Sequence, residues 1–231
     1  MSCLHILSGG AAQGLVKRLA PAFKASTGFD IKGEFGAVGF MADRLRSGVP
    51  ADLVILTAAL VARLAAEGLV LPRSMQDIGE VETALAVRGG DPLVTASNAA
   101  ELRAAFVAAD AIFVPDTKAS TAGIHVASVL QQLGIADAVA ARLKIHPNGA
   151  TAMRHLAASD ASRPLGCTQS TEIISTDGVA LSGPLPSGFA LKTMYTGAVV
   201  EQATSPRQAQ ALIDLLTSAD AHAARGGAGF C

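Results

Sequence analysis

The stretch that decides the fold is LHILSGGAAQG, residues 4–14. Its first four residues, 4–7, predict a short strand, and small residues lead directly from them into an amphipathic helical pattern. Ser8 can cap this helix, while Gly9 and Gly10 let the backbone approach a ligand closely. Because the first N–H groups of a helix lack partners within it and attract negative charge, the junction predicts a place for an anion.

The same pattern occurs twice more before residue 70. A predicted strand at 29–35 leads through small residues into a helix at 40–47. Another strand, at 53–56, leads through a Thr-Ala-Ala turn into a third helix. Open parallel sheets bind ligands beyond the carboxyl ends of their strands, so we expect the three helix starts to face one crevice.

The composition limits the class of protein. The chain has 231 residues, of which 50% are hydrophobic and 16% charged, and its net charge is -1. Such a chain can bury a large core in one or two domains. With no basic excess, eight Phe, one Tyr and no Trp, we expect no nucleic-acid partner. No apolar run approaches the roughly 20 residues needed to cross a bilayer, so we expect no membrane insertion.

The cysteines and the start of the chain add two further expectations. Cys3, Cys167 and Cys231 are odd in number and lack metal-ligand spacing, so we expect no disulfide framework, no structural metal and no cofactor. No leader pattern precedes the first predicted strand, which favours a cytoplasmic protein. Removal of a leader would instead make the protein periplasmic.

The alternation of strands and helices predicts an α/β fold with mainly parallel sheets. An extended segment at 82–88 is expected to cross into a second lobe, and a segment at 191–200 to return. We therefore expect two lobes joined by a hinge, with lobe 1 at 1–82 and 195–231 and lobe 2 at 83–194.

The second lobe is expected to contain several further elements. These are a helix at 99–109, a strand at 111–114, a long helix from Ser120 to 133, a helical pair at 136–143 and 150–158, and a buried strand at 164–167. A terminal helix at 206–217 has apolar residues at helical spacing and is expected to pack on the first lobe.

Five segments occur in an order that resembles a known family. They are residues 4–23, 41–55, 120–123, 164–172 and 183–186. Together they resemble the substrate-binding proteins of molybdate transporters and their relatives, which include aconitate-isomerase-type proteins. The resemblance spans nearly the whole chain, and its most specific part is the Gly-x-Pro-Ala-Asp run within the second segment. It implies a class II periplasmic-binding-protein fold, a two-lobed clamshell that closes on a small anionic ligand.

The resemblance also shows where this chain departs from the molybdate-binding members. Those relatives place serine hydroxyls in the first two turns, where this chain has Ala11 and Gly39. They often place a tyrosine where this chain has Gln169. A hydrogen bond to a charged group contributes about 1.5–3 kcal/mol, so these losses imply much weaker oxyanion binding. We expect a di- or tricarboxylate rather than molybdate.

The ligand-binding residues implied by the resemblance are small or neutral polar residues in the strand-to-helix turns. In the first lobe they are Ser8, Gly9, Gly10, Ala11, Ala37, Val38, Gly39, Thr57 and Ala58, and in the second they are Ser120, Thr121, Thr151, Thr168, Gln169 and Ser170. Backbone N–H groups and hydroxyls of this kind suit a small carboxylate or another anion.

Three titratable residues are candidates for catalysis, each with a structural alternative. Lys118 precedes the helix at 120–133 and could pair with a carboxylate, or it could be a solvated lysine. His125 lies in the first turns of that helix, where it could act as a general acid or base or only pack. Cys167 ends a buried strand and could be a proton-transfer thiol or a small buried hydrophobic residue.

These observations leave three functions open. A solute receptor would clamp an anion and deliver it to the permease of an ABC transporter, which is what most relatives do. An intracellular isomerase would remove an allylic proton from an unsaturated carboxylate and return it elsewhere. An anion sensor would bind without chemistry. The departures at Ala11 and Gly39 favour the isomerase.

Overall fold

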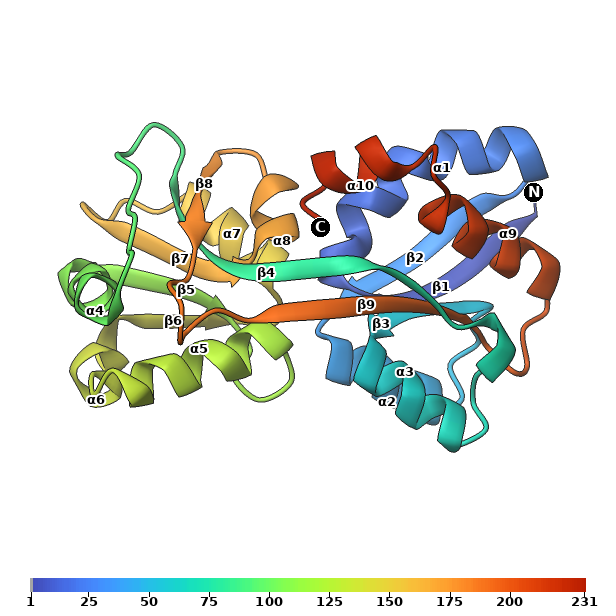
Figure 1. The fold of residues 1–231 in the computed structure, drawn as a ribbon, viewed down its shortest axis with the longest axis horizontal. Coiled ribbons are helices and arrows are strands. Elements are labelled where there is room, and N and C mark those ends of the chain that lie inside the picture. Colours follow the sequence, from blue (N-terminus) through green and yellow to red (C-terminus); the bar gives the residue numbers. More distant parts are fainter. Residues whose placement is uncertain (1) are drawn as a thin grey trace. The chain divides into compact units, whose positions relative to one another are not determined.

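The computed structural model describes residues 2–231, and these divide into two compact units. Unit 1 contains the chain up to Val81 together with Thr193–Cys231, and unit 2 contains Glu82–Lys192. The lobe boundaries expected from the sequence lie one and two residues further along the chain. Two strands, β4 (Gln76–Arg88) and β9 (Lys192–Val199), carry the chain from one unit to the other (Figure 1).

Unit 1 is built on a sheet with the strand order β2-β1-β3-β9. Strands β2, β1 and β3 are parallel, and β9 is antiparallel to β3. Besides β4 and β9, the elements of this unit are β1 (Cys3–Gly9), η1 (Gly10–Ala12), α1 (Gln13–Thr27), β2 (Asp30–Gly36), α2 (Val38–Arg46), β3 (Leu53–Thr57), α3 (Ala58–Ala66), η2 (Pro72–Ser74), α9 (Pro206–Thr217) and α10 (His222–Gly227).

The sequence pattern explains this arrangement. All five residues of β3 are buried, as expected for a central strand covered by helices on both faces. Helices α1, α9 and α10 lie on one side of the sheet, and α2 and α3 lie on the other (Figure 1). Helix α1 buries Leu15, Val16 and Phe23 and ends at Gly28, whose φ of 75° suits a left-handed C-cap.

Unit 2 is built on a sheet with the strand order β4-β7-β5-β6, and β8 pairs with β4. Strands β5, β6 and β7 are parallel, whereas β4 is antiparallel to β7 and β8. The elements here are α4 (Ala99–Ala108), β5 (Ala111–Pro115), α5 (Thr121–Gln132), α6 (Ala136–Val139), η3 (Ala140–Arg142), β6 (Leu143–His146), α7 (Gly149–Ala157), β7 (Pro164–Gln169), α8 (Ser170–Ile174) and β8 (Val179–Pro184).

Strand β5 shows how one apolar run serves two cores. Ile112 and Val114 pack with residues of α4 and α5 on one face of the sheet. Ala111 and Phe113 pack with residues of α7 on the other face. Successive side chains of a strand point to opposite faces, so five consecutive buried residues are needed to fill both layers. The predicted α/β class with mainly parallel sheets is confirmed.

The structure corrects several element predictions. Residues 136–143 do not form one helix of a helical pair: α6 and η3 end at Arg142, and β6 follows at the edge of the sheet. This strand has four residues and none of them is buried, so it lacks the apolar pattern that identifies interior strands. Strand β4 also begins at Gln76 rather than at 82, and the short helices α8 and α10 had not been predicted.

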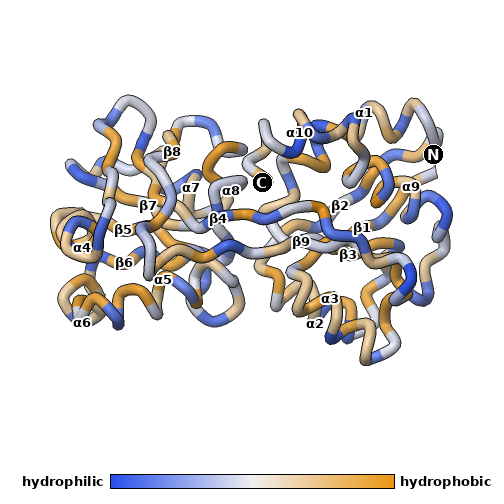
Figure 2. Tube along the Cα trace, in the orientation of Figure 1, coloured by the Kyte–Doolittle hydropathy of each residue, from blue (hydrophilic) through white to orange (hydrophobic). Residues whose placement is uncertain are grey.

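Apolar residues recur along the helices and strands of both units, interspersed with polar ones (Figure 2). Within residues 2–231 no single helix is long and apolar enough to cross a membrane. One bent pair, Thr121–Gln132 with Ala136–Arg142, passes on length and composition alone.

Candidate functional site

The parallel strands of unit 1 end at one edge of its sheet. Gly9 pairs with Gly36 at the ends of β1 and β2, and the neighbouring strand β3 ends at Thr57. Helical backbone follows each strand, beginning with η1, α2 and α3. The first-lobe residues named from the sequence therefore lie in three neighbouring turns along this edge.

Two of these turns lead into helix starts that no side chain caps. Gly9 precedes η1 and Ala37 precedes α2, and neither start has a side-chain cap. The first N–H groups of such starts have no acceptor within the helix, which makes both turns suitable for negative charge. By contrast, the Thr57 hydroxyl accepts a hydrogen bond from the Leu60 N–H at the start of α3, so that turn is capped by its own side chain.

The prediction that Ser8 caps the first helix is wrong. The strand continues through Ser8 to Gly9, and the Ser8 hydroxyl donates to the Gly9 carbonyl. Gly9 itself is required by packing, because a Cβ there would lie 2.7 Å from Val38 Cγ1 and 2.9 Å from Tyr195 Cε1. Tyr195, the single tyrosine of the chain, is buried at this edge opposite Thr57, and sequence reasoning did not single it out.

In unit 2 the parallel strands β5, β6 and β7 also end at one edge, at Pro115, His146 and Gln169. The turn after β5 is ordered by Asp116, whose carboxylate accepts the backbone N–H groups of Lys118 and Ala119 at 2.7 and 2.8 Å. These bonds hold the pKa of Asp116 below its usual value.

The start of α5, which follows this turn, resembles the uncapped starts of unit 1. Ser120 precedes α5 without capping it by its side chain. Lys118 is exposed and lies two residues before Ser120. Gly123 allows α5 to approach the Asp116 turn, because a Cβ at this glycine would overlap the carbonyl of Asp116.

His125 forms a specific hydrogen bond. Its Nε2 lies 2.7 Å from the backbone carbonyl of Phe189, and the side chain is half-buried. Because a carbonyl only accepts, Nε2 carries the proton, and in the neutral ring Nδ1 is left as the acceptor. The hydrogen bond positions the ring and fixes its tautomer.

Cys167 is poorly suited to proton transfer. It is fully buried within strand β7 and packs in the apolar core against α5. Burial raises the pKa of its thiol to about 12, so the reactive thiolate is disfavoured at neutral pH. The geometry favours the alternative role, a small hydrophobic side chain in the core.

The structure adds a residue that sequence reasoning missed as a site residue, Glu172. It is 5% exposed and lies on α8, where its carboxylate accepts the Thr168 hydroxyl at 2.6 Å and the backbone N–H groups of Gly149, Ala150 and Gln169. Burial raises the pKa of Glu172, and these four hydrogen bonds oppose the rise. The sequence signal for this role is the position of Glu172, two residues after Ser170, which was expected to bind the ligand.

The start of α7 is therefore occupied by groups of the protein itself. The Asn148 side chain accepts from the Thr151 N–H at 2.9 Å, and Glu172 accepts from the two preceding N–H groups. The Thr151 hydroxyl accepts from Arg154. Although Thr151 was expected to bind the ligand, these contacts join it to the cap and to its own helix.

Two histidines lie beside the same turn. The rings of His146 and His155 are stacked with their centroids 4.3 Å apart, and the Phe113 ring also stacks on His146, at 5.9 Å. Burial and the neighbouring His155 lower the pKa of His146. Within residues 2–231 no three His, Cys, Asp or Glu side chains form a group that could hold a metal ion.

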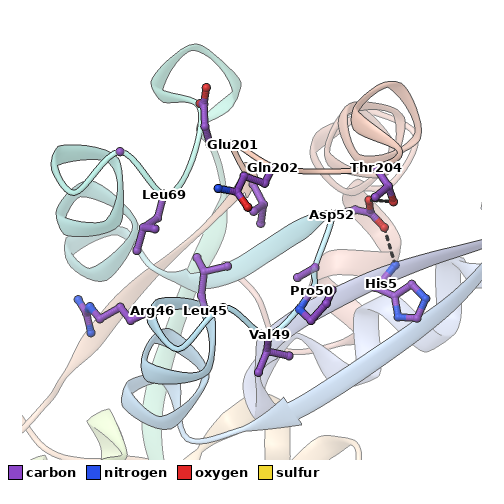
Figure 3. Close-up of a pocket in the computed structure, with 14 residues that line it drawn as sticks. His5, Leu45, Arg46, Val49, Pro50, Asp52, Leu69, Glu201, Gln202 and Thr204 are labelled. Carbon is purple, nitrogen blue, oxygen red and sulfur yellow. Dashed lines mark hydrogen bonds between the residues drawn. The ribbon is translucent and has the colours of Figure 1, made fainter.

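Unit 1 also contains a cavity of about 360 Å³ at the opposite edge of its sheet, where β1 and β3 begin (Figure 3). The Gly-x-Pro-Ala-Asp run lines it. Asp52, which ends this run, is buried and accepts from the His5 N–H, the Thr204 hydroxyl and the Ser205 N–H at 2.8–3.0 Å. The most specific sequence motif therefore ties β1, β3 and the segment before α9 together.

Comparison with known proteins agrees with this architecture. The family model described as bacterial extracellular solute-binding protein matches residues 4–231. An aconitate isomerase from a Pseudomonas species is 30% identical over 232 aligned residues, which cover 96% of this chain and 84% of that protein.

Two solved structures share the fold. The periplasmic molybdate-binding protein of Azotobacter vinelandii superposes with a TM-score of 0.83 at 18% identity, over 99% of this chain and 98% of that one. The sulfate-binding protein of Mycobacterium tuberculosis H37Rv gives 0.77 at 20% identity, over 100% and 86%. The expected class II periplasmic-binding-protein fold is confirmed, and the chain belongs to the family of bacterial extracellular solute-binding proteins.

Proposed function

We propose that the protein is an isomerase that moves the C=C bond of an unsaturated tricarboxylate of the aconitate type. The observation that carries the proposal is the 30% identity to an aconitate isomerase along 96% of the chain. A second observation supports it. By the resemblance, Ala11 and Gly39 stand at the positions of the first two turns where molybdate-binding members have serines, so unit 1 offers backbone N–H groups there in place of hydroxyl donors.

In this proposal the carboxylates of the ligand bind to backbone N–H groups at the uncapped helix starts. Unit 1 offers such starts after β1 and β2, and unit 2 offers one after β5. The exposed ammonium of Lys118 pairs with one carboxylate. Thr121, Gln169 and Ser170 remain proposed contacts of unit 2. Thr168 is not among them, because its side chain is fully buried and its hydroxyl donates to Glu172.

Proton transfer then needs one base close to neutral pH. His125 is the candidate that the local geometry favours, because its Nε2–H bond to Phe189 leaves Nδ1 as the acceptor. The base removes an allylic proton, the electron pair spreads over the allylic system towards a carboxylate, and the proton returns at the other end. The double bond moves and no atom is gained or lost.

The test is conversion between cis- and trans-aconitate by the purified protein, followed by NMR. The informative variant is His125→Gln, because the glutamine amide can still donate to the Phe189 carbonyl but cannot act as a base. We expect the wild type to reach the equilibrium mixture and His125→Gln to lose at least about 100-fold in kcat, in the range of general base catalysis. A fully active, folded His125→Gln variant would remove His125 from this role.

The second candidate function is the solute-binding component of an ABC transporter for molybdate or a related oxyanion. The family description and the fold shared with molybdate- and sulfate-binding proteins favour it. Calorimetric titration with molybdate, sulfate and trans-aconitate separates the two functions. Tight oxyanion binding together with no turnover of any unsaturated carboxylate would make this candidate the better one.

The two candidates also differ in where the protein acts. The isomerase is proposed to be cytoplasmic, whereas a transport protein would work outside the cytoplasmic membrane with a permease partner. Fractionation of cells that express the native gene, with immunodetection of the protein, distinguishes these locations.

A further inference from the structure

The start of α7 in unit 2 is occupied by a carboxylate of the chain itself. This helix has nine residues, and the N–H groups of its first two, Gly149 and Ala150, hydrogen-bond Glu172. The backbone N–H groups at the first turn of a helix favour negative charge. The Glu172 carboxylate therefore lies at a position where the helix start favours negative charge.

The surroundings of the Glu172 carboxylate are built to hold it. The Thr168 hydroxyl and the Gln169 N–H complete a set of four donors. Gly149 allows the close approach, since a Cβ at this position would overlap both Glu172 Oε2 and Thr168 Oγ1. A buried carboxylate with this number of donors is held in one place.

We propose that Glu172 is a specificity-determining residue whose carboxylate occupies the start of α7 and so prevents compact oxyanions from binding there. The inference rests on the proposed function in one respect, namely that the ligand is an anion bound at this edge of unit 2. A tetrahedral dianion such as molybdate needs many donors around one centre, and here two backbone donors are used and a negative charge stands beside them. A tricarboxylate spreads its charge along a carbon skeleton and can use the α5 start instead.

The experiment compares two substitutions that separate occupancy from charge. Glu172→Ala empties the start of α7, whereas Glu172→Gln keeps it filled and removes the charge. Glu101→Ala is the matched control, because Glu101 also accepts hydrogen bonds at a helix start, from Ser97 and Asn98, but at α4. Binding of sodium molybdate, sodium sulfate and trans-aconitate is measured by calorimetry at constant ionic strength, and thermal unfolding is measured in sodium formate.

We expect the affinity for molybdate or sulfate to rise at least 10-fold in Glu172→Ala and at least 3-fold in Glu172→Gln, with a change below 2-fold in the control. Formate should raise the unfolding temperature of Glu172→Ala in a concentration-dependent manner and leave the wild type unchanged. A purely structural role would lower stability in both variants without changing the oxyanion-to-carboxylate ratio.

A folded Glu172→Ala protein whose oxyanion affinity stays within 2-fold of the wild type would overturn the inference. If this variant does not fold, Glu172→Gln decides, and an unchanged oxyanion affinity in that variant is equally contrary. Isomerase activity is scored separately on the wild type. If the wild type shows no turnover but the variants gain oxyanion affinity, only the proposed function is contradicted. If the wild type isomerises aconitate but the variants gain no oxyanion affinity, only the role of Glu172 is contradicted.

Discussion

Among residues 2–231 each unit buries one carboxylate. One lies where the parallel strands of its sheet begin, and the other lies where they end. Asp52 of unit 1 lies where parallel strands begin, and its three donors come from β1 and the segment before α9. Glu172 of unit 2 lies where parallel strands end, and its donors come from the first two residues of α7 and the last two residues of β7. Both carboxylates have hydrogen-bond donors, but only the donors of Glu172 lie at the carboxyl ends of parallel strands, where open sheets bind ligands. A buried carboxylate can therefore stabilise a fold or tune a site, depending on whether it lies at the amino ends or the carboxyl ends of the parallel strands.

The largest effect is expected from Gly149→Ala. The new Cβ would overlap Glu172 and Thr168, so the carboxylate must leave its donors, and we expect unit 2 to lose about 3–5 kcal/mol of stability. Urea unfolding measures the loss. Gly226→Ala is the control, because a Cβ there meets nothing within 4 Å and should change stability by less than about 1 kcal/mol. Equal, small effects of both changes would mean that Glu172 is not held as described.

Asp52→Ala tests the other carboxylate. Its removal leaves three donors unpaired near the start of β1 and before α9, so we expect a loss of about 2–4 kcal/mol. Because Asp52 lies away from the carboxyl ends of the strands, ligand affinity at a temperature where the variant is folded should stay within about 2-fold of the wild type. Calorimetry alongside chemical unfolding checks both parts. A selective loss of ligand binding would contradict the structural role.

Cys167→Ala provides a comparison within unit 2, because Cys167 is buried next to Thr168 but is not among the donors to Glu172. We expect a loss of about 1 kcal/mol from the smaller side chain and turnover within about 2-fold of the wild type. In the native protein a thiol reagent should label the exposed Cys231 and reach Cys167 only on unfolding. A folded Cys167→Ala protein with a 10-fold lower kcat would restore Cys167 as a catalytic candidate.

The smallest effect concerns the histidine stack beside α7. The pKa of His146 lies below its usual 6.5 in the folded protein, so the unfolded chain takes up the proton more readily. Stability that is present above pH 6.5 is therefore lost as the pH falls below it. We expect the unfolding temperature to fall by a few degrees more between pH 7.5 and 5.5 in the wild type than in His146→Phe, which keeps an aromatic ring. Parallel pH profiles for the two proteins would argue against this.

The sequence predicted the parts of the fold that have strong periodic or turn signals. The terminal helix α9 was predicted at its observed bounds, and the strand-to-helix turns after β1, β2 and β3 were placed correctly. Strand β6 was missed because an edge strand of four partly exposed residues has no apolar pattern.

The candidate site was harder to predict, because side-chain contacts decide it. Nothing local in the sequence shows that Glu172 reaches the start of α7, since its partners Gly149 and Ala150 lie more than 20 residues earlier. The same holds for the bond between His125 and the Phe189 carbonyl, which joins residues 64 positions apart. Residue types could suggest an anion site, but only tertiary packing shows which helix starts the chain itself occupies.

The most direct test of the account is deuterium uptake by aconitate in heavy water. Wild-type protein is incubated with trans-aconitate in D₂O, and the carbon-bound hydrogens are followed by NMR. The account predicts catalytic exchange at the allylic position together with appearance of the cis isomer, at a rate that saturates with substrate. Saturable binding of aconitate without exchange or double-bond movement would contradict it.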